Sequence, residues 1–167
     1  ELSEVSFLNK QISGGSKSLG ILACGIAFNY VMEIRERYNL SFPVLKIGQY
    51  PLPKKIVGDF FKTCESVLVV EEGYPVYEEL LRGYFNDTEK IKGRLDGTLP
   101  RTGELNPDFI ARALKIRIEH AEEVNEAVKN RPPSLCLGCS HRDVYEALNE
   151  VLRGLEHHVF SDIGCYT

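Results

Sequence analysis

The chain has 167 residues and a formal net charge of −4; 43% of its residues are hydrophobic and 26% are charged. This composition is typical of a soluble globular protein with one domain, or with one domain and part of another. The negative charge gives no electrostatic basis for nucleic acid or an anionic membrane as partner. No apolar run approaches the ~20 residues that span a bilayer, and the N-terminus has no signal-peptide pattern.

The cysteine content indicates a reducing compartment, and we therefore expect a cytoplasmic protein. The five cysteines are an odd number, and Cys24 and Cys64 fall in apolar periodic segments. Such a pattern favours free or metal-bound thiols over a disulfide framework. Because the sequence begins without Met and ends just after a glycine-cysteine turn, we also expect a fragment of a longer protein.

Strands and helices are expected to alternate in the first part of the chain. Residues 1–18 are polar and end in SGGSKS, which predicts a flexible lead-in. Short apolar runs predict strands, and apolar residues at helical spacing predict helices. The strands are expected at Leu19–Cys24, Val44–Ile47 and Ser66–Glu71, and the helices at residues 27–38, 53–62 and 75–82. This alternation predicts an α/β fold, with a parallel sheet between two layers of helices over residues 19–100.

The next part of the chain predicts a less regular structure. Residues 87–103 are rich in Gly, Lys, Asp and Thr and are expected to form a loop. Residues 101–133 are expected to be a linker with helices. Asn106 followed by Pro107 predicts one helix start, and the charged segment of residues 116–129 predicts an exposed helix.

Residues 134–167 are expected to begin another domain. Ser140 resembles the N-cap of a helix, and residues 158–160 predict a new strand. The side chains expected on the buried side of this helix are Val144, Leu148, Val151 and Leu152.

Three cysteines in this last part are the main candidates for chemistry. Cys136 and Cys139 form a Cys-x-x-Cys pair on a glycine-containing turn, and Cys165 follows a glycine. Thiolates at loop ends can turn toward a common metal or cluster, and this spacing occurs in zinc ribbons, iron–sulfur proteins and redox pairs. His141 would complete a Cys₃His zinc set. The alternative is that the cysteines are small core residues; a thioredoxin-like pair is disfavoured because it would follow a strand.

Two turns also offer backbone N–H groups to a phosphate. Residues 138–141 lie at the expected helix start, and Ile163, Gly164 and Cys165 form a second turn. N–H groups at a helix start can hold phosphate oxygens, although neither turn matches a dinucleotide or Walker fingerprint. His141 would then contact an anionic cofactor; the alternative is that it lies in an exposed first turn.

The residues taken together resemble a known family. The runs LCLGCSHRDVYEAL and FSDIGCYT are similar to the Cys-Pro-Gly-Cys-Pro-His-Arg and Gly-Asp-Ile-Gly-Cys-Tyr-Thr motifs of the indolepyruvate:ferredoxin oxidoreductase alpha subunit. ILACGIAFNYV, VLKIGQYPLP, VLVVEE and LPRTGEL resemble the same subunit in the same order. The resemblance covers the chain from about Leu19 to Thr167.

The resemblance implies an oxidoreductase that decarboxylates aryl pyruvates such as indolepyruvate to acyl-CoA and passes electrons to ferredoxin. Its cofactors would be thiamine diphosphate, Mg²⁺, coenzyme A and [4Fe–4S] clusters, and its partners a beta subunit, ferredoxin and the 2-oxoacid. Residues 19–100 would correspond to a transketolase C-terminal-like domain. Residues 134–167 would be the N-terminal part of a thiamine-diphosphate-binding domain. The fragment alone would be inactive.

Individual residues acquire roles from this resemblance. Cys136, Cys139 and Cys165 resemble three cysteines that hold the proximal cluster in related enzymes. Gly138 and His141, together with the turn from Ile163 through Gly164 and Cys165 to Tyr166, would line the thiamine diphosphate site. Leu137 and Ser140 stand where the family usually has proline, which predicts a looser loop. The rival hypothesis is a non-enzymatic α/β scaffold with a Cys₃His zinc site.

Overall fold

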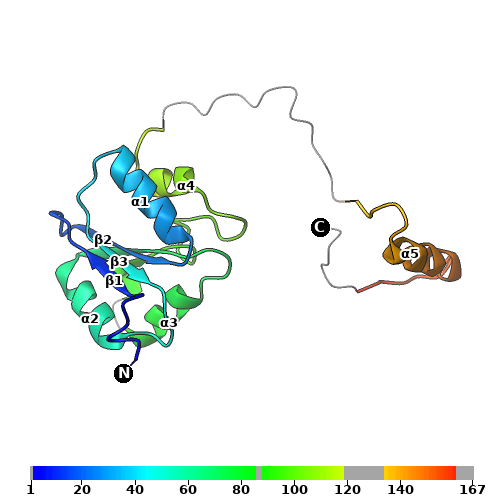
Figure 1. Cartoon of the computed structure of the whole chain (residues 1–167), viewed down its shortest axis with the longest axis horizontal. Helices are drawn as coiled ribbons and strands as arrows, with labels where there is room; N and C mark the ends of the chain where they lie inside the picture. The colour runs from blue at the N-terminus through cyan, green and yellow to red at the C-terminus, as the bar shows by residue number, and fades with distance from the viewer. Residues whose placement is uncertain (1, 86–87, 119–133, 161–167) are drawn as a thin grey trace. The chain divides into compact units, whose positions relative to one another are not determined.

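The computed structural model describes residues 2–85, 88–118 and 134–160 (Figure 1). The chain divides into two compact units, Glu1–Ala121 and Glu122–Thr167. Within the described ranges, no helix combines the length and apolar character needed to cross a membrane.

The first unit is built on a five-stranded sheet with the strand order β1-β3-β2-β4-β5. Its strands are β1 (Lys10–Ile12), β2 (Leu19–Cys24), β3 (Val44–Ile47), β4 (Ser66–Val70) and β5 (Ile91–Lys92). Its helices are α1 (Ala27–Arg37), α2 (Lys54–Thr63), α3 (Val76–Tyr84), α4 (Pro107–Ala113) and the short 3₁₀ helix η1 (Thr88–Lys90). β2, β3, β4 and β5 are parallel, and β1 is antiparallel to β3.

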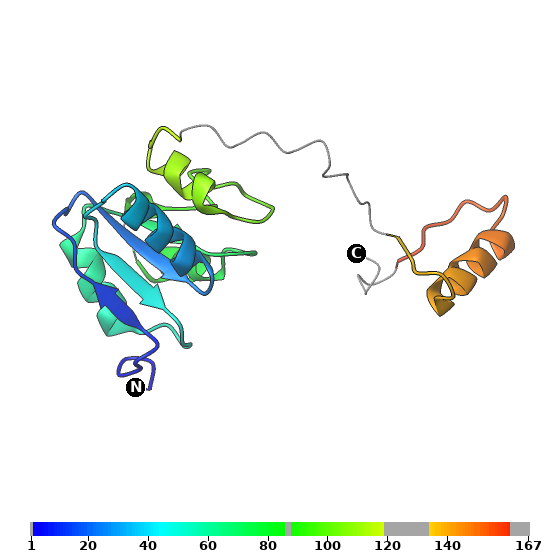
Figure 2. The same cartoon turned by 45° about the horizontal axis from the view of Figure 1, so that its top comes forward.

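Helices cover both faces of this sheet, so the predicted three-layer α/β arrangement is confirmed (Figure 2). Successive residues of a strand point to opposite faces. In β2, Ile21 therefore packs with α1 and α4 on one face, whereas Leu22 packs with α2 and α3 on the other. β2 and β3 have the predicted bounds, and β4 ends one residue earlier than predicted.

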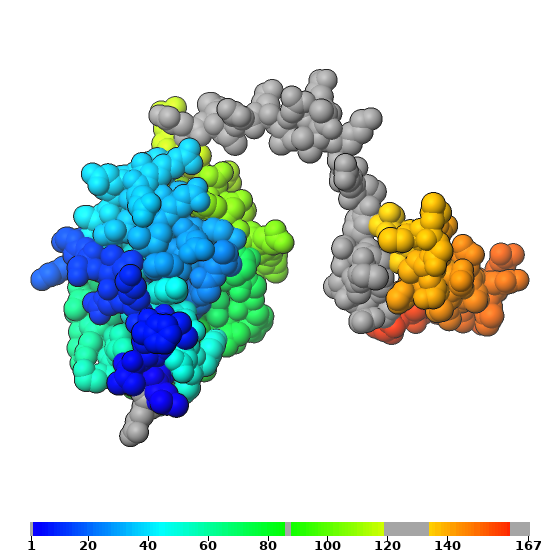
Figure 3. All heavy atoms as spheres, in the orientation of Figure 1, coloured from blue at the N-terminus to red at the C-terminus, as the bar shows by residue number. Residues whose placement is uncertain are grey.

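The N-terminal segment differs from the expected flexible lead-in. Residues 10–12 pair with β3 as the antiparallel edge strand β1. The Glu4 carboxylate accepts hydrogen bonds from the backbone N–H groups of Lys55 (2.8 Å) and Ile56 (3.2 Å) at the start of α2. Space-filling atoms show this segment lying along the surface of the unit, in dark blue (Figure 3). It is therefore attached to the first unit by strand pairing and by side-chain hydrogen bonds.

The first unit also continues beyond the expected boundary at residue 100. α4 begins with Asn106 as N-cap, whose side chain accepts from the Phe109 N–H at 3.2 Å, as the sequence predicted. Ile110 and Ala111 on this helix are buried in the core beside α1. The first part of the expected linker thus belongs to the α/β unit. Most of the expected charged helix lies outside the described residues.

Two buried charges organise the segment after α3. The Glu78 carboxylate accepts from Arg82 at 3.0 Å and from the backbone N–H groups of Arg94 (2.7 Å) and Leu95 (3.1 Å). The Arg94 guanidinium donates to the backbone carbonyls of Glu71 (3.0 Å), Pro100 (2.6 Å) and Gly103 (3.1 Å). Both side chains are 1% exposed. The segment expected to be a loop is therefore held in place, and part of it forms η1 and β5.

The described part of the second unit contains one helix, α5 (Ser140–Val151). Its expected buried side is not buried: Val144 is 55% exposed and Val151 is 74% exposed. Residues 158–160 are irregular rather than a strand. A strand requires a neighbouring strand, and an apolar helix face is buried only when another element packs on it. No described residue covers the apolar face of α5.

We expect Glu78→Ala to destabilise the first unit by about 3–5 kcal/mol, because it removes one partner of a buried, hydrogen-bonded ion pair. Urea unfolding followed by circular dichroism measures the change. Glu79→Ala is the matched control, since Glu79 is the next residue and is exposed. Equal stability of the two variants would contradict the role assigned to Glu78.

Candidate functional site

The predicted Cys-x-x-Cys pair lies on a tight turn. The Cys139 N–H donates to the Cys136 carbonyl at 3.2 Å. Gly138 between them has φ +76°, a left-handed backbone conformation that residues other than glycine rarely adopt. The Cys136 side chain is exposed and that of Cys139 is half-buried. The turn thus presents two free thiols at the surface of the described part of this unit.

The second cysteine also starts α5. Cys139, rather than the predicted Ser140, is the N-cap, with extended backbone angles (φ −73°, ψ 126°). Its carbonyl accepts from the Arg142 N–H at 3.0 Å. At a helix start the first N–H groups have no acceptor within the helix, and the helix dipole favours an anion there. The acid Asp143 lies in the same first turn.

His141 lies close to the second thiol. The distance between its Nδ1 and the Cys139 Sγ is 3.5 Å. Two such donors on one tetrahedral zinc, with bonds of about 2.3 Å to sulfur and about 2.1 Å to nitrogen, would lie roughly 3.6 Å apart. The imidazole is therefore placed where it can share a metal with Cys139, or exchange a hydrogen bond with its thiol.

The described residues bring together part of the predicted site. Cys136, Gly138, Cys139 and His141 meet at the start of α5. The other predicted residues, Ile163, Gly164, Cys165 and Tyr166, lie outside the described residues. Within the ranges that the structure describes, no group of three or more His, Cys, Asp or Glu side chains could hold a metal ion. Cys139 and His141, 3.5 Å apart, could supply two positions of a sulfur-rich ligand set.

The LPRTGEL segment, residues 99–105, carries no recognisable functional motif in the sequence. Arg94 holds its backbone at Pro100 and Gly103, and the Arg101 guanidinium lies 5.7 Å from the centre of the Tyr74 ring. The segment lines one side of a cavity of about 490 Å³. The burial of Arg94, which fixes this segment, could not be predicted from the sequence.

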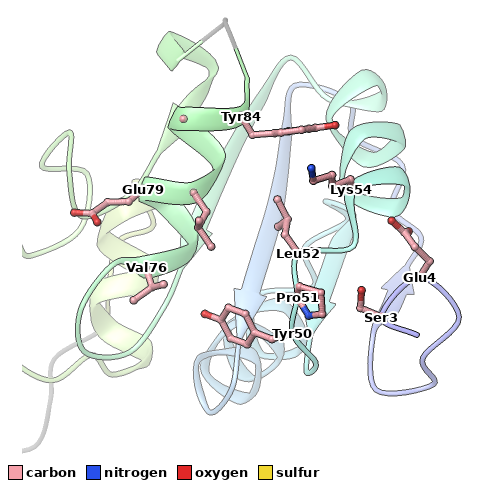
Figure 4. Close-up of a pocket in the computed structure, with 11 residues that line it drawn as sticks. Ser3, Glu4, Tyr50, Pro51, Leu52, Lys54, Val76, Glu79 and Tyr84 are labelled. Atoms are coloured by element: carbon pink, nitrogen blue, oxygen red, sulfur yellow. The ribbon is translucent and has the colours of Figure 1, made fainter. Parts of the chain in front are cut away.

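A larger groove lies between the start of α2 and the outer face of α3 (Figure 4). Its volume is about 860 Å³. Tyr50, Leu52 and Tyr84 supply much of its apolar lining, and the Lys54 ammonium lies 5.0 Å from the centre of the Tyr84 ring. This surface belongs to the first unit and does not include the cysteine turn.

Comparison with known proteins identifies similar sequences. No family model matches the chain. It is 40% identical to indolepyruvate oxidoreductase subunit IorA of Methanothermobacter thermautotrophicus, with 97% of this chain and 28% of that subunit aligned. The corresponding subunit of Methanothermobacter marburgensis is 38% identical, with 99% and 29% aligned. The IorA subunit of Archaeoglobus fulgidus is 32% identical, with 93% of this chain and 27% of that subunit aligned.

These matches confirm the resemblance that the motifs showed, and the chain spans less than a third of the length of these relatives. Among solved structures, a 2-oxoglutarate:ferredoxin oxidoreductase from Magnetococcus marinus matches with a TM-score of 0.53. That match covers 67% of this chain and 20% of the other at 18% identity, so it supports the fold alone.

The four described cysteines should differ in reactivity toward iodoacetamide at neutral pH. We expect Cys136 to be alkylated first, because its thiol is exposed. Cys64 is buried, and burial together with the nearby Glu71 carboxylate raises the pKa of the Cys24 thiol, so both should react slowly. Peptide mass mapping over time measures each rate. Alkylation of Cys24 as fast as Cys136 would contradict this order.

Proposed function

We propose that this chain is a segment of the alpha subunit of a 2-oxoacid:ferredoxin oxidoreductase of the indolepyruvate type. One observation carries the proposal: nearly the whole chain aligns at 40% identity with a subunit of that name. The exposed turn of Cys136 and Cys139 agrees with it, because two thiols at a helix start suit a cluster ligand set.

The two units suggest how the segment divides. The first unit, with a mainly parallel sheet covered on both faces, would be the transketolase C-terminal-like domain. The second would begin the thiamine-diphosphate-binding domain. A chain division after Ala121 supports this assignment, since it lies in the segment that the sequence predicted to be a linker.

In this proposal, Cys136, Cys139 and Cys165 hold a [4Fe–4S] cluster. Gly138 and His141, with residues 163–166, line the thiamine diphosphate site. The left-handed Gly138 lies just before the start of α5, where the positive end of the helix dipole favours the negative charge of a diphosphate. Thiamine diphosphate would supply the electron sink for decarboxylation, and iron–sulfur clusters would carry the electrons.

The whole enzyme would act on an aryl pyruvate such as indolepyruvate. It would use Mg²⁺ and coenzyme A, assemble with a beta subunit and reduce ferredoxin. Support for the substrate comes from the name of the similar subunits, and coenzyme A is bound in the Magnetococcus marinus structure. The described cysteines are all free, as expected in a reducing compartment, which supports a cytoplasmic location.

A second candidate function is a scaffold with a structural zinc site. It is favoured by the 3.5 Å separation of Cys139 Sγ and His141 Nδ1, which matches the spacing of two donors on one tetrahedral zinc. In that case Cys136, Cys139, Cys165 and His141 would be the four ligands.

Anaerobic reconstitution of the chain with iron and sulfide distinguishes the two candidates. We expect the visible absorption and EPR signals of an iron–sulfur cluster, and their loss in both Cys136→Ser and Cys165→Ser, because each variant removes a thiolate ligand. Cys64→Ala is the matched control, since Cys64 is buried in the first unit and should leave the signals unchanged.

Two other outcomes would contradict the cluster proposal. An unchanged cluster signal in the Cys136→Ser and Cys165→Ser variants would place any cluster elsewhere. Binding of about one zinc per chain without a cluster signal, abolished by His141→Ala, would establish the zinc site instead.

A further inference from the structure

The first unit contains a crevice at the carboxyl ends of its parallel strands. β2 and β4 are neighbours in the sheet, but the chain leaves them toward opposite faces. After β2 it enters α1, which packs on one face, and after β4 it enters α3, which packs on the other. In open α/β sheets this divergence creates a crevice where ligands bind. The cysteine turn takes no part in it.

A cavity of about 300 Å³ lies at this position. The described residues that line it include none that is basic. Its ionisable side chains are Cys24, Tyr50, Glu71, Glu72 and Tyr77. Its other lining residues are Gly25, Ile26, Ile47, Gly48 and Gln49. The walls therefore combine acidic groups, two aromatic rings and two aliphatic side chains.

The Tyr77 hydroxyl is an unsatisfied polar group within this cluster. Tyr77 is 1% exposed, and its hydroxyl has no hydrogen-bond partner in the described part of the chain. Burial first, and then the nearby Cys24, Tyr50 and Glu71, raise the pKa of Tyr77. The hydroxyl therefore stays protonated at neutral pH, and Tyr77 itself lines the cavity beside Tyr50. Buried polar groups without a partner are rare in folded proteins and require an explanation.

The Glu71 carboxylate is the second polar group in the crevice. It is held by the start of α3, where its Oε2 accepts from the Tyr77 N–H at 2.8 Å, and Glu71 is 8% exposed. Burial raises the pKa of the Glu71 carboxyl, and hydrogen bonds from the backbone N–H groups of Tyr77 and Glu78 oppose this effect. The Arg94 guanidinium already donates to three backbone carbonyls and lies 3.8 Å from Glu72. Arg94 therefore binds other groups, and it is not among the residues that line the cavity.

We propose that this crevice binds a small organic ammonium ion. The ammonium group would donate to the Glu71 carboxylate and to the Tyr77 hydroxyl oxygen, which gives the buried hydroxyl its missing partner. The Tyr50 and Tyr77 rings, with centres 4.8 Å apart, would add cation–π attraction. Ile26 and Ile47 would contact the apolar part of the ligand.

An organic cation fits this cavity better than a metal ion. Hard divalent cations take six or more oxygen ligands, whereas this lining offers two carboxylates, and Glu72 also accepts from the Leu105 N–H at 3.0 Å. The aliphatic and aromatic walls favour a ligand with an apolar body. This inference goes beyond the proposed function and stands if the cysteines hold no cluster.

Isothermal titration calorimetry of the 167-residue chain with benzylammonium at neutral pH tests the site. We expect saturable binding with a Kd of about 1 mM or tighter. Benzyl alcohol, the neutral analogue, should bind at least tenfold more weakly, because it cannot form an ion pair with Glu71. Glu71→Gln should weaken benzylammonium binding by a similar factor while it keeps an acceptor oxygen for the Tyr77 N–H.

The Tyr77→Phe variant tests whether the unpartnered Tyr77 hydroxyl serves a ligand or is only a packing defect. It removes the unpartnered hydroxyl, so the free protein should unfold at the same or a higher temperature, while benzylammonium binding weakens several-fold. Glu36→Gln removes an equal charge from the exposed side of α1 and should leave binding unchanged. Absence of saturable binding, or equal affinity in the wild type, Glu71→Gln and Tyr77→Phe, would overturn the proposal.

Discussion

The buried hydrogen-bonded network of Glu78 and Arg94 holds the carboxyl edge of the first unit together. Buried charges are costly unless their partners are complete, and here both side chains bind backbone groups as well as charges. The network joins α3 to the segment that follows β5, and it ties Glu71, directly after β4, to the LPRTGEL segment. Gly93 is part of the same constraint, because a Cβ there would collide with the Glu78 carboxylate.

This constraint also explains the crevice between β2 and β4. Glu71 ends the central part of the sheet, its carbonyl is fixed by Arg94, and its carboxylate caps the start of α3. Tyr77, the second residue of α3, is thereby placed over the same edge as Cys24. Acidic and phenolic groups meet there, while the Arg94 guanidinium donates to three backbone carbonyls and also lies 3.8 Å from Glu72.

The sequence predicted the centre of the fold better than its edges. β2, β3 and β4 are short, mainly apolar runs whose residues are mostly buried, and such runs identify interior parallel strands. β1 has three residues and β5 has two, both contain lysine, and each pairs with a single neighbouring strand. The composition of these short segments therefore predicts a loop. The burial of Arg94 depends on carbonyls that come together only after folding, and no local pattern signals it.

The cysteine turn was predictable in part. The spacing of Cys136 and Cys139 and the glycine between them indicated a turn that presents two thiols, and the structure has this turn. The approach of His141 to Cys139 depends on the rotation of the first helical residues, which spacing does not fix. The apolar stripe on α5 predicted burial, but an amphipathic pattern identifies a face that can be covered and does not supply the partner.

The most direct test of the proposed function is an activity assay of a longer alpha subunit that contains this chain, assembled with its beta subunit. Ferredoxin reduction is measured with indolepyruvate and coenzyme A, beside the Cys136→Ser variant and the isolated 167-residue chain. We predict activity that depends on both substrates, its loss in Cys136→Ser, and none in the isolated chain. Full activity in Cys136→Ser, turnover by the isolated chain, or no dependence on an aryl pyruvate would contradict the account.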